Sequence, residues 1–300
     1  CINGVTGPDE YNTVVDNNTY TNLMARENLS HAAAEVERLR LEDPERYRGL
    51  VGRTGVEETE VADWREAADR MYVPYDEELR IHLQDDSFLS RKPWDFEHTP
   101  EDKYPLLLHF HPLVIYRHQV SKQADILLAM LLLSEDFDED EKRRAFDFLD
   151  PLTTADSSLS PCIQSILAYE LEYFDKARQY GMASFFMDVG DVAGNVESGC
   201  HIAAMGGSWM TLVYGIAGLR DYDGELRFRP RVPLRASRIK FSLTVRDNLL
   251  DVEIDTDRAV YSLREGSGLA LWYEGEELRL SPEAPAQERP LAPTVSRSAA

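Results

Sequence analysis

RIKFSLTVRDNLLDVEID, residues 238–255, alternates apolar and polar side chains on either side of a short polar interruption. The alternation runs through 239–245 before the interruption and resumes at 250–254 after it. A period of two places the apolar side chains of a strand on one face. The stretch therefore predicts an antiparallel β-hairpin with one buried face and a turn at Asp247-Asn248.

The chain changes character near residue 220. Between about 17 and 218 the apolar spacing is that of amphipathic helices, as in the stripe that contains Val61, Trp64 and Ala68. The predicted helices, separated by long loops such as 74–118, are 18–42, 61–72, 123–133, 138–148, 159–172, 175–188 and 200–217. After residue 220 a further strand is predicted at 269–273. The predicted fold is mainly α: a helical domain over 1–219, a small antiparallel β domain over 220–290, and a disordered tail over 291–300.

Composition excludes several classes of partner. The 300 residues include 32 Lys and Arg against 54 Asp and Glu, for a formal net charge of −22. Nucleic acids and anionic membranes bind basic surfaces, so neither is expected as a partner. A hydrophobic content of 43% is enough for a globular core. The longest strongly apolar run, 126–133, is too short to cross a bilayer.

The cysteines and the first residues bear on location and completeness. The cysteines at positions 1, 162 and 200 are odd in number and lack metal-ligand spacing, which favours a reducing compartment such as the cytoplasm and gives no sign of a metal site. The sequence opens with Cys-Ile-Asn-Gly and has no signal segment. We therefore expect a fragment whose N-terminal part is missing.

The first twenty residues hold the sharpest candidate site. Gly7-Pro8-Asp9-Glu10-Tyr11 is typical of a stiff turn, and 16–18 are good N-cap residue types for a following helix. A carboxylate held in such a loop can act as a general acid. In a chain with 54 acidic residues, however, chemistry alone does not single out Glu10.

Five stretches together resemble glycoside hydrolase family 65. They are INGVTGPDEY (2–11), DNNTYTN (16–22), YRHQVSKQAD (116–125), DSSLS (156–160) and ESGCHIAAMGGSW (197–209). The resemblance spans about residues 1–234, and the ordered set is far more specific than any one member. The family contains inverting phosphorylases of maltose, trehalose, kojibiose or nigerose and some α-glucoside hydrolases.

The resemblance implies a fold and a set of roles. The helical part would be the second half of an (α/α)6 barrel, followed by the small β domain. Glu10 would be the general acid, Lys122 and Gln123 would bind the substrate, and Ser157, Ser158 and His201 would bind phosphate. Phosphate would be a co-substrate beside the disaccharide, with no other cofactor. Family members are often homodimers, although nothing in this sequence establishes an oligomeric state.

Other interpretations remain open at this level. A phosphorylase needs no base, because phosphate is already an anionic nucleophile, whereas an inverting hydrolase needs a second carboxylate to activate water. Asp156 could be that carboxylate, or it could orient the serine loop. The serines could simply cap a helix, and His201 could be a core histidine. A fragment that only binds sugar or serves as an interaction module is the remaining alternative.

Overall fold

The computed structural model describes residues 1–154, 156–232 and 237–291. They fall into two compact units, Cys1–Asp156 and Ser157–Ala300. Among the described helices, none is long and apolar enough to cross a membrane. The tail predicted at 291–300 lies outside the described residues, apart from Leu291.

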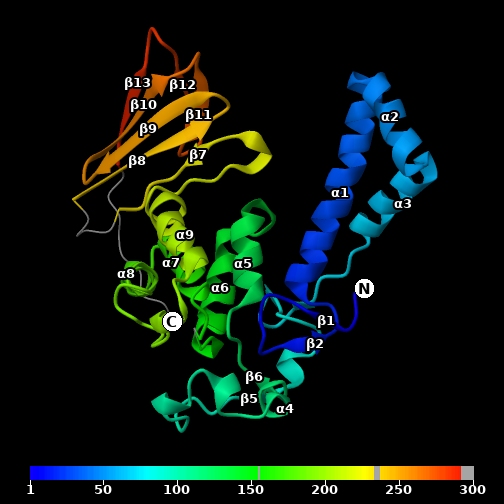
Figure 1. The fold of residues 1–300 in the computed structure, drawn as a ribbon, viewed down its shortest axis with the longest axis vertical. Coiled ribbons are helices and arrows are strands. Elements are labelled where there is room, and N and C mark those ends of the chain that lie inside the picture. The colour runs from blue at the N-terminus through cyan, green and yellow to red at the C-terminus, as the bar shows by residue number, and fades with distance from the viewer. Residues whose placement is uncertain (155, 233–236, 292–300) are drawn as a thin grey trace. The chain divides into compact units, whose positions relative to one another are not determined.

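The helices of the first unit follow most of the predicted stretches (Figure 1). They are α1 (Thr19–Glu42), α2 (Pro44–Thr54), α3 (Glu58–Asp69), α4 (Pro112–Ile115), α5 (Asp125–Leu132) and α6 (Glu139–Leu149). Asn18 caps the N-terminus of α1, because its side chain accepts the N–H of Thr21 at 2.9 Å, and the helix packs along α3. Helix α2, which buries no residue, was not predicted.

Short strands and turns fill the rest of the first unit. The strands are β1 (Val5–Thr6), β2 (Thr13–Val15), β3 (Tyr75–Asp76), β4 (Ile81–His82), β5 (Lys92–Pro93) and β6 (His118–Gln119). Pairs β1–β2 and β3–β4 are antiparallel, and β5–β6 is parallel. The segment predicted as a long loop, 74–118, also contains 3₁₀ turns at Phe88–Ser90, Glu101–Lys103 and Leu106–Leu108.

The second unit begins with helices and continues with strands. Its helices are α7 (Ser160–Glu170), α8 (Phe174–Phe185) and α9 (Ile202–Met210), and a π-helical turn, Thr211–Ile216, extends α9. Helix α7 packs against both α8 and α9. The strands are β7 (Arg227–Phe228), β8 (Arg238–Val245), β9 (Asn248–Asp255), β10 (Arg258–Glu265), β11 (Leu269–Tyr273), β12 (Glu276–Leu280) and β13 (Ala286–Pro290).

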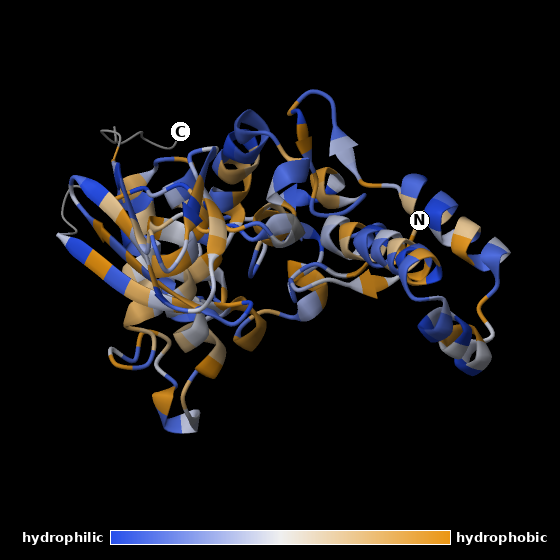
Figure 2. Ribbon diagram, turned by 90° about the horizontal axis from the view of Figure 1, so that it is seen from above, coloured by the Kyte–Doolittle hydropathy of each residue, from blue (hydrophilic) through white to orange (hydrophobic). Residues whose placement is uncertain are grey.

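The strands form two sheets around one apolar core. Their orders are β13-β10-β9-β8 and β12-β11-β7. Buried residues of both sheets, among them Val252, Tyr261 and Leu271, share one cluster. The alternation of hydrophobic and hydrophilic residues along these strands is visible in Figure 2. The mainly helical fold with small, largely antiparallel sheets is thus confirmed, whereas the (α/α)6 barrel and the boundary at 219/220 stay predictions.

The predicted hairpin is present, with its turn one residue earlier than expected. In the β8–β9 pair, Phe241 lies opposite Val252, so the two apolar rows share a face. The turn residues are Arg246 and Asp247, both with positive φ (47° and 64°). Asn248 belongs to β9 and is buried, and its side-chain amide donates to the carbonyl oxygen of Arg246 at 2.8 Å. The predicted turn at Asp247-Asn248 was wrong because the Asn side chain fixes the turn from inside the strand.

Candidate active site

Glu10 lies in the connection between β1 and β2, with a buried residue on each side. Residues 7–12 join these antiparallel strands. Asp9 and Tyr11 are both fully buried, whereas 57% of the Glu10 side chain is exposed. The turn is therefore anchored by the neighbours of Glu10, and the Glu10 carboxylate stays accessible to a ligand.

Gly7 allows this turn to approach a buried polar pair. A Cβ at Gly7 would overlap the side chains of Asn18 and Asp125. Asn18 Nδ2 donates to Asp125 Oδ2 at 2.9 Å, while Asn18 Oδ1 caps α1. Asp125 is 1% exposed, and burial, followed by repulsion from Asp9, raises its pKa well above the ordinary value. Any residue larger than glycine at position 7 would displace this pair.

Asp9 joins the Glu10 turn to the segment that contains Lys122 and Gln123. Its Oδ1 accepts the backbone N–H groups of Tyr11 at 3.2 Å, Lys122 at 2.8 Å and Gln123 at 3.4 Å. Burial raises the pKa of Asp9, although these hydrogen bonds and one from Asn12 oppose the shift. A carboxylate that accepts several backbone donors fixes the geometry of both segments at once.

The two predicted sugar-binding residues contact the turn that carries the predicted acid. Lys122 Nζ lies 2.5 Å from Glu10 Oε2, and the Gln123 side-chain amide donates to the carbonyl oxygen of Pro8. Helix α5 begins only at Asp125, so both residues precede the helix instead of forming its first turn. The structure therefore brings Glu10, Lys122 and Gln123 together.

The serine loop begins the second unit. Ser157 Oγ accepts the N–H of Leu159 at 3.2 Å, and α7 starts at Ser160. Leu159 is the N-cap residue and no side chain caps this helix, so the interpretation of Ser157 or Ser158 as a helix cap was wrong. Both serines are partly exposed. Their hydroxyl groups precede a helix N-terminus, where the helix dipole favours an anion.

His201 is held by an acidic partner from the same unit. It is the N-cap residue of α9, and its Nδ1 lies 2.6 Å from Asp188 Oδ1. The His201 backbone N–H also donates to Asp188, with both N–O distances at 3.1 Å. These bonds lower the pKa of Asp188. Because Nδ1 is bound to the carboxylate, Nε2 is the nitrogen left for a ligand.

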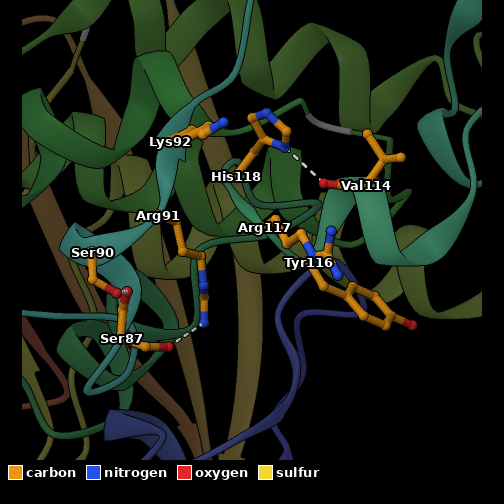
Figure 3. Close-up of a pocket in the computed structure, with 8 residues that line it drawn as sticks. All are labelled: Ser87, Ser90, Arg91, Lys92, Val114, Tyr116, Arg117 and His118. Carbon is orange, nitrogen blue, oxygen red and sulfur yellow. Dashed lines mark hydrogen bonds between the residues drawn. The ribbon is translucent and has the colours of Figure 1, made fainter.

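A cavity of about 580 Å³ in the first unit is not the predicted site. Its lining includes Arg91, Lys92, Arg117 and His118, shown in Figure 3. Arg91 is paired with the buried Asp85, at 2.8 Å from Oδ1 and 2.9 Å from Oδ2. None of the predicted site residues lines this cavity, although Tyr116, Arg117 and His118 belong to the 116–125 motif. We locate the candidate site by the contacts of Glu10, because catalysis depends on the mutual geometry of the reacting groups and not on the volume of a cavity.

Sequence reasoning missed two residues that hold the candidate groups. Asp9 belongs to the motif around Glu10, and a charged residue flanked by turn residues could have been weighed as an anchor. Asp188 gave no signal, because it precedes His201 by 13 residues in a stretch without a motif. Within the described residues, no group of three or more His, Cys, Asp or Glu side chains could hold a metal ion.

Two family models cover most of the chain. The glycosyl hydrolase family 65 central catalytic domain matches residues 1–210, and the C-terminal domain of the same family matches residues 219–280. The chain therefore belongs to glycoside hydrolase family 65.

Several similar proteins are described as phosphorylases. An α,α-trehalose phosphorylase of Thermoanaerobacter brockii is 43% identical over 280 residues, which are 93% of this chain and 36% of that protein. A maltose phosphorylase of Bacillus subtilis is 35% identical over 89% of this chain and 34% of its own length. A solved structure from the human microbiome, provisionally assigned as a kojibiose phosphorylase, matches with a TM-score of 0.85 at 26% identity, over 96% of this chain and 37% of that one. The chain thus spans about a third of the length of these relatives.

Proposed function

We propose that this chain supplies catalytic residues of an inverting disaccharide phosphorylase. The whole protein would use inorganic phosphate to split an α-glucosyl disaccharide of the maltose, trehalose or kojibiose type. The products would be β-glucose 1-phosphate and a free sugar. Residues 1–219 would form part of an (α/α)6 barrel and residues 220–290 its C-terminal β domain. The observation that carries the proposal is the contact of Glu10 with Lys122, because it joins an exposed acid to a predicted sugar ligand.

The chemistry assigns one role to each group. An oxygen of phosphate would attack the anomeric carbon from the face opposite the glycosidic bond, so the configuration inverts from α to β. The glycosidic bond would break as Glu10 gives its proton to the departing oxygen. A carboxylic acid that carries this proton cannot pair with an ammonium ion. Bound sugar would therefore separate Lys122 Nζ from Glu10, and Lys122 would then bind sugar hydroxyl groups.

Phosphate would be held by neutral and cationic donors. Ser157 and Ser158 would offer hydroxyl groups near the start of α7, and His201 would donate from Nε2 while Asp188 holds Nδ1. These donors stabilise the attacking anion and place it in line, which is what a phosphorylase needs in place of a base. The location would be a reducing compartment such as the cytoplasm, which the odd number of cysteines in the sequence favours.

The hydrolase alternative is less well supported because of where Asp156 lies. Its Oδ2 accepts the Tyr11 hydroxyl at 2.5 Å and the Leu106 N–H at 3.2 Å. A base that activates water needs a carboxylate free to accept from that water. An oxygen that already accepts two protein donors is better suited to holding a loop in place.

The decisive experiment follows initial rates against phosphate concentration. Trehalose, maltose and kojibiose are supplied to the whole protein and, separately, to the 300-residue chain, and the sugar products are identified. We expect β-glucose 1-phosphate and a rate that falls toward zero without phosphate. Phosphate-independent release of glucose would reject the phosphorylase proposal. If only the whole protein cleaves a disaccharide, residues outside this chain are needed for catalysis.

His201→Ala tests the phosphate site in the same assay. Loss of a hydrogen bond to a charged ligand costs about 1.5–3 kcal/mol, which corresponds to about 10- to 150-fold in rate at low phosphate. The loss should shrink as phosphate is raised, and the KM for the disaccharide should change little. A matched control is the exposed His98→Ala, which should behave like the unchanged protein. An equal loss at all phosphate concentrations would remove His201 from the phosphate site.

A further inference from the structure

One hydrogen bond joins two segments that are far apart in the sequence. The Tyr11 hydroxyl donates to Asp156 Oδ2 at 2.5 Å, across 145 positions of the chain. The backbone N–H of Leu106 points at the same place, 2.9 Å from the Tyr11 hydroxyl oxygen and 3.2 Å from Asp156 Oδ2. Both residues belong to the first compact unit.

The Tyr11 hydroxyl is fixed by its surroundings. Tyr11 is fully buried in a small apolar cluster with Trp94, Leu106, Ile115 and Val120. Burial, together with the hydrogen bond to Asp156, raises the pKa of Tyr11 above its ordinary value. The hydroxyl therefore keeps its proton and stays a donor. A packed ring with one polar atom leaves that atom little freedom to choose another partner.

A second contact holds the segment that leads to Asp156. The Thr154 N–H donates to the carbonyl oxygen of Ser121 at 2.8 Å, and Ser121 N–H donates to Leu152 at 2.9 Å. Ser121 directly precedes Lys122. The backbone N–H of Asp156 in turn donates to Thr154 Oγ1 at 3.3 Å. The approach to Asp156 is thus held alongside the segment that binds Glu10.

The neighbours of the two bonded residues give the bond its significance. Tyr11 follows Glu10 immediately, and Asp156 immediately precedes Ser157. We infer that the Tyr11–Asp156 hydrogen bond is a positioning link, which sets the start of the phosphate-binding serine loop relative to the turn that carries the general acid. This inference rests on the proposed function. Tyr11 and Asp156 are positioning residues, and neither would touch the reacting atoms.

Such a link addresses a requirement of the reaction. In an inverting displacement the attacking phosphate and the acid act on opposite sides of the same sugar, so their separation must be held within about 0.5 Å. The acid and the serines come from sequence segments about 150 residues apart. A direct hydrogen bond between Tyr11, next to the acid, and Asp156, next to the serines, fixes the distance between the two segments. Loss of the bond should loosen phosphate binding more than sugar binding.

Tyr11→Phe is the first variant, because it removes the hydroxyl and keeps the ring. We expect the KM for phosphate to rise about tenfold or more, as for loss of a hydrogen bond to a charged acceptor. The KM for the disaccharide should stay within about twofold. The matched control is Tyr261→Phe: Tyr261 is also fully buried, and its hydroxyl has no hydrogen-bond partner. It should leave both KM values unchanged.

The Asp156 variants separate positioning from catalysis by a base. Asp156→Asn keeps an oxygen that can accept from Tyr11 and Leu106, so it should retain phosphorolysis within about tenfold, whereas Asp156→Ala should show the raised KM for phosphate. Equal and near-complete loss in both variants would overturn the inference and point to a base. Melting temperatures of all four variants are measured in parallel, so that the KM ratio is compared only between folded proteins.

The outcomes distinguish this inference from the function on which it rests. If cleavage by the unchanged protein does not depend on phosphate, the proposed function fails. If cleavage depends on phosphate but Tyr11→Phe raises the two KM values equally or not at all, the function stands and the positioning link is rejected. The link is supported if Tyr11→Phe and Asp156→Ala raise the KM for phosphate selectively and Asp156→Asn does not.

Discussion

Strand β9 of the hairpin and the surroundings of Glu10 are both well buried, but by opposite means. In the hairpin, Leu243 lies opposite Leu250, and every inward position from 250 to 254 is apolar. Around Glu10 the fully buried side chains include Asp9 and Gln84, and Asp125 is 1% exposed. One region excludes water with hydrocarbon, and the other with a network of hydrogen bonds.

The difference shows what each kind of core requires. Apolar burial has no directional requirement, so a face of any well-packed aliphatic side chains is stable. A buried polar group must find partners at the right distance and angle, or it costs stability. Asp9 finds its partners 113 and 114 positions away, at the backbones of Lys122 and Gln123. The polar region therefore holds a defined geometry, which a catalytic site needs, and the hairpin supplies stability.

Glu10→Gln should have the largest effect on the polar side of this comparison. Glutamine keeps the size of the side chain but cannot give a proton to the leaving oxygen. We expect cleavage of the natural disaccharide to fall by about 100- to 10,000-fold, the usual contribution of a general acid, with little change in melting temperature. The rate is measured as release of β-glucose 1-phosphate by the whole protein at saturating phosphate.

Two controls make the Glu10 result specific. A glucosyl fluoride needs far less protonation of its leaving group, so Glu10→Gln should slow its cleavage much less. The exposed Glu97→Gln should leave both reactions unchanged. A Gln variant that cleaves the disaccharide within a few-fold of the normal rate would exclude Glu10 as the acid.

Leu250→Ala should have the next largest effect, and only on stability. Leu250 is fully buried in the apolar core, with Leu243 opposite it on one neighbouring strand and Leu263 on the other. Removing its side chain should lower the free energy of unfolding by about 2–5 kcal/mol. Denaturant titration measures the change, and kcat below the unfolding transition should not move.

The neighbouring Leu249 provides the matched control for this prediction. It is partly exposed and points to the other face of β9, so Leu249→Ala should cost about 1 kcal/mol or less. A large loss of kcat in folded Leu250→Ala would mean that the hairpin contributes to the geometry of the site. The contrast between a stabilising region and a positioning region would then fail.

The same contrast explains how much could be predicted from the sequence. The periods of 3.6 and 2 depend on neighbouring residues, so α1, α5 and β8 were predicted to within a few positions. Strand β10 was missed, although it lies inside the sheet, because the apolar run Ala259-Val260-Tyr261 interrupts the period of two. The resemblance to a family provided the candidate residues, including Glu10.

The anchors of the candidate site could not be predicted in this way. Asp9 is buried by contacts with Lys122 and Gln123, which lie more than 100 positions away in the sequence. Local periodicity contains no information about such long-range contacts. Asp188 is likewise recognised only by its contact with His201. Turn chemistry was predicted more closely: the hairpin turn was misplaced by one residue because Asn248 acts from within the strand.

Asp125→Asn should have the smallest effect, and it tests the stability cost of the polar region. Burial and the nearby Asp9 raise the pKa of Asp125 well above its ordinary value, and its Oδ1 has no hydrogen-bond partner. A raised pKa means that the folded state holds a proton that the unfolded state has released. Stability from this group is thus full below about pH 4, falls as pH rises toward the folded pKa, and stays low above it.

Asparagine has the shape of the neutral acid and does not titrate. Asp125→Asn should therefore match the unchanged protein near pH 4 and exceed it by on the order of 1 kcal/mol at neutral pH. The free energy of unfolding is measured from pH 4 to 8 beside Asp102→Asn, an exposed carboxylate whose replacement should leave the pH profile unchanged. If the difference in the free energy of unfolding between Asp125→Asn and the unchanged protein does not grow with pH, ionisation of the buried carboxyl does not lower stability. The polar region would then cost no more stability than the apolar one.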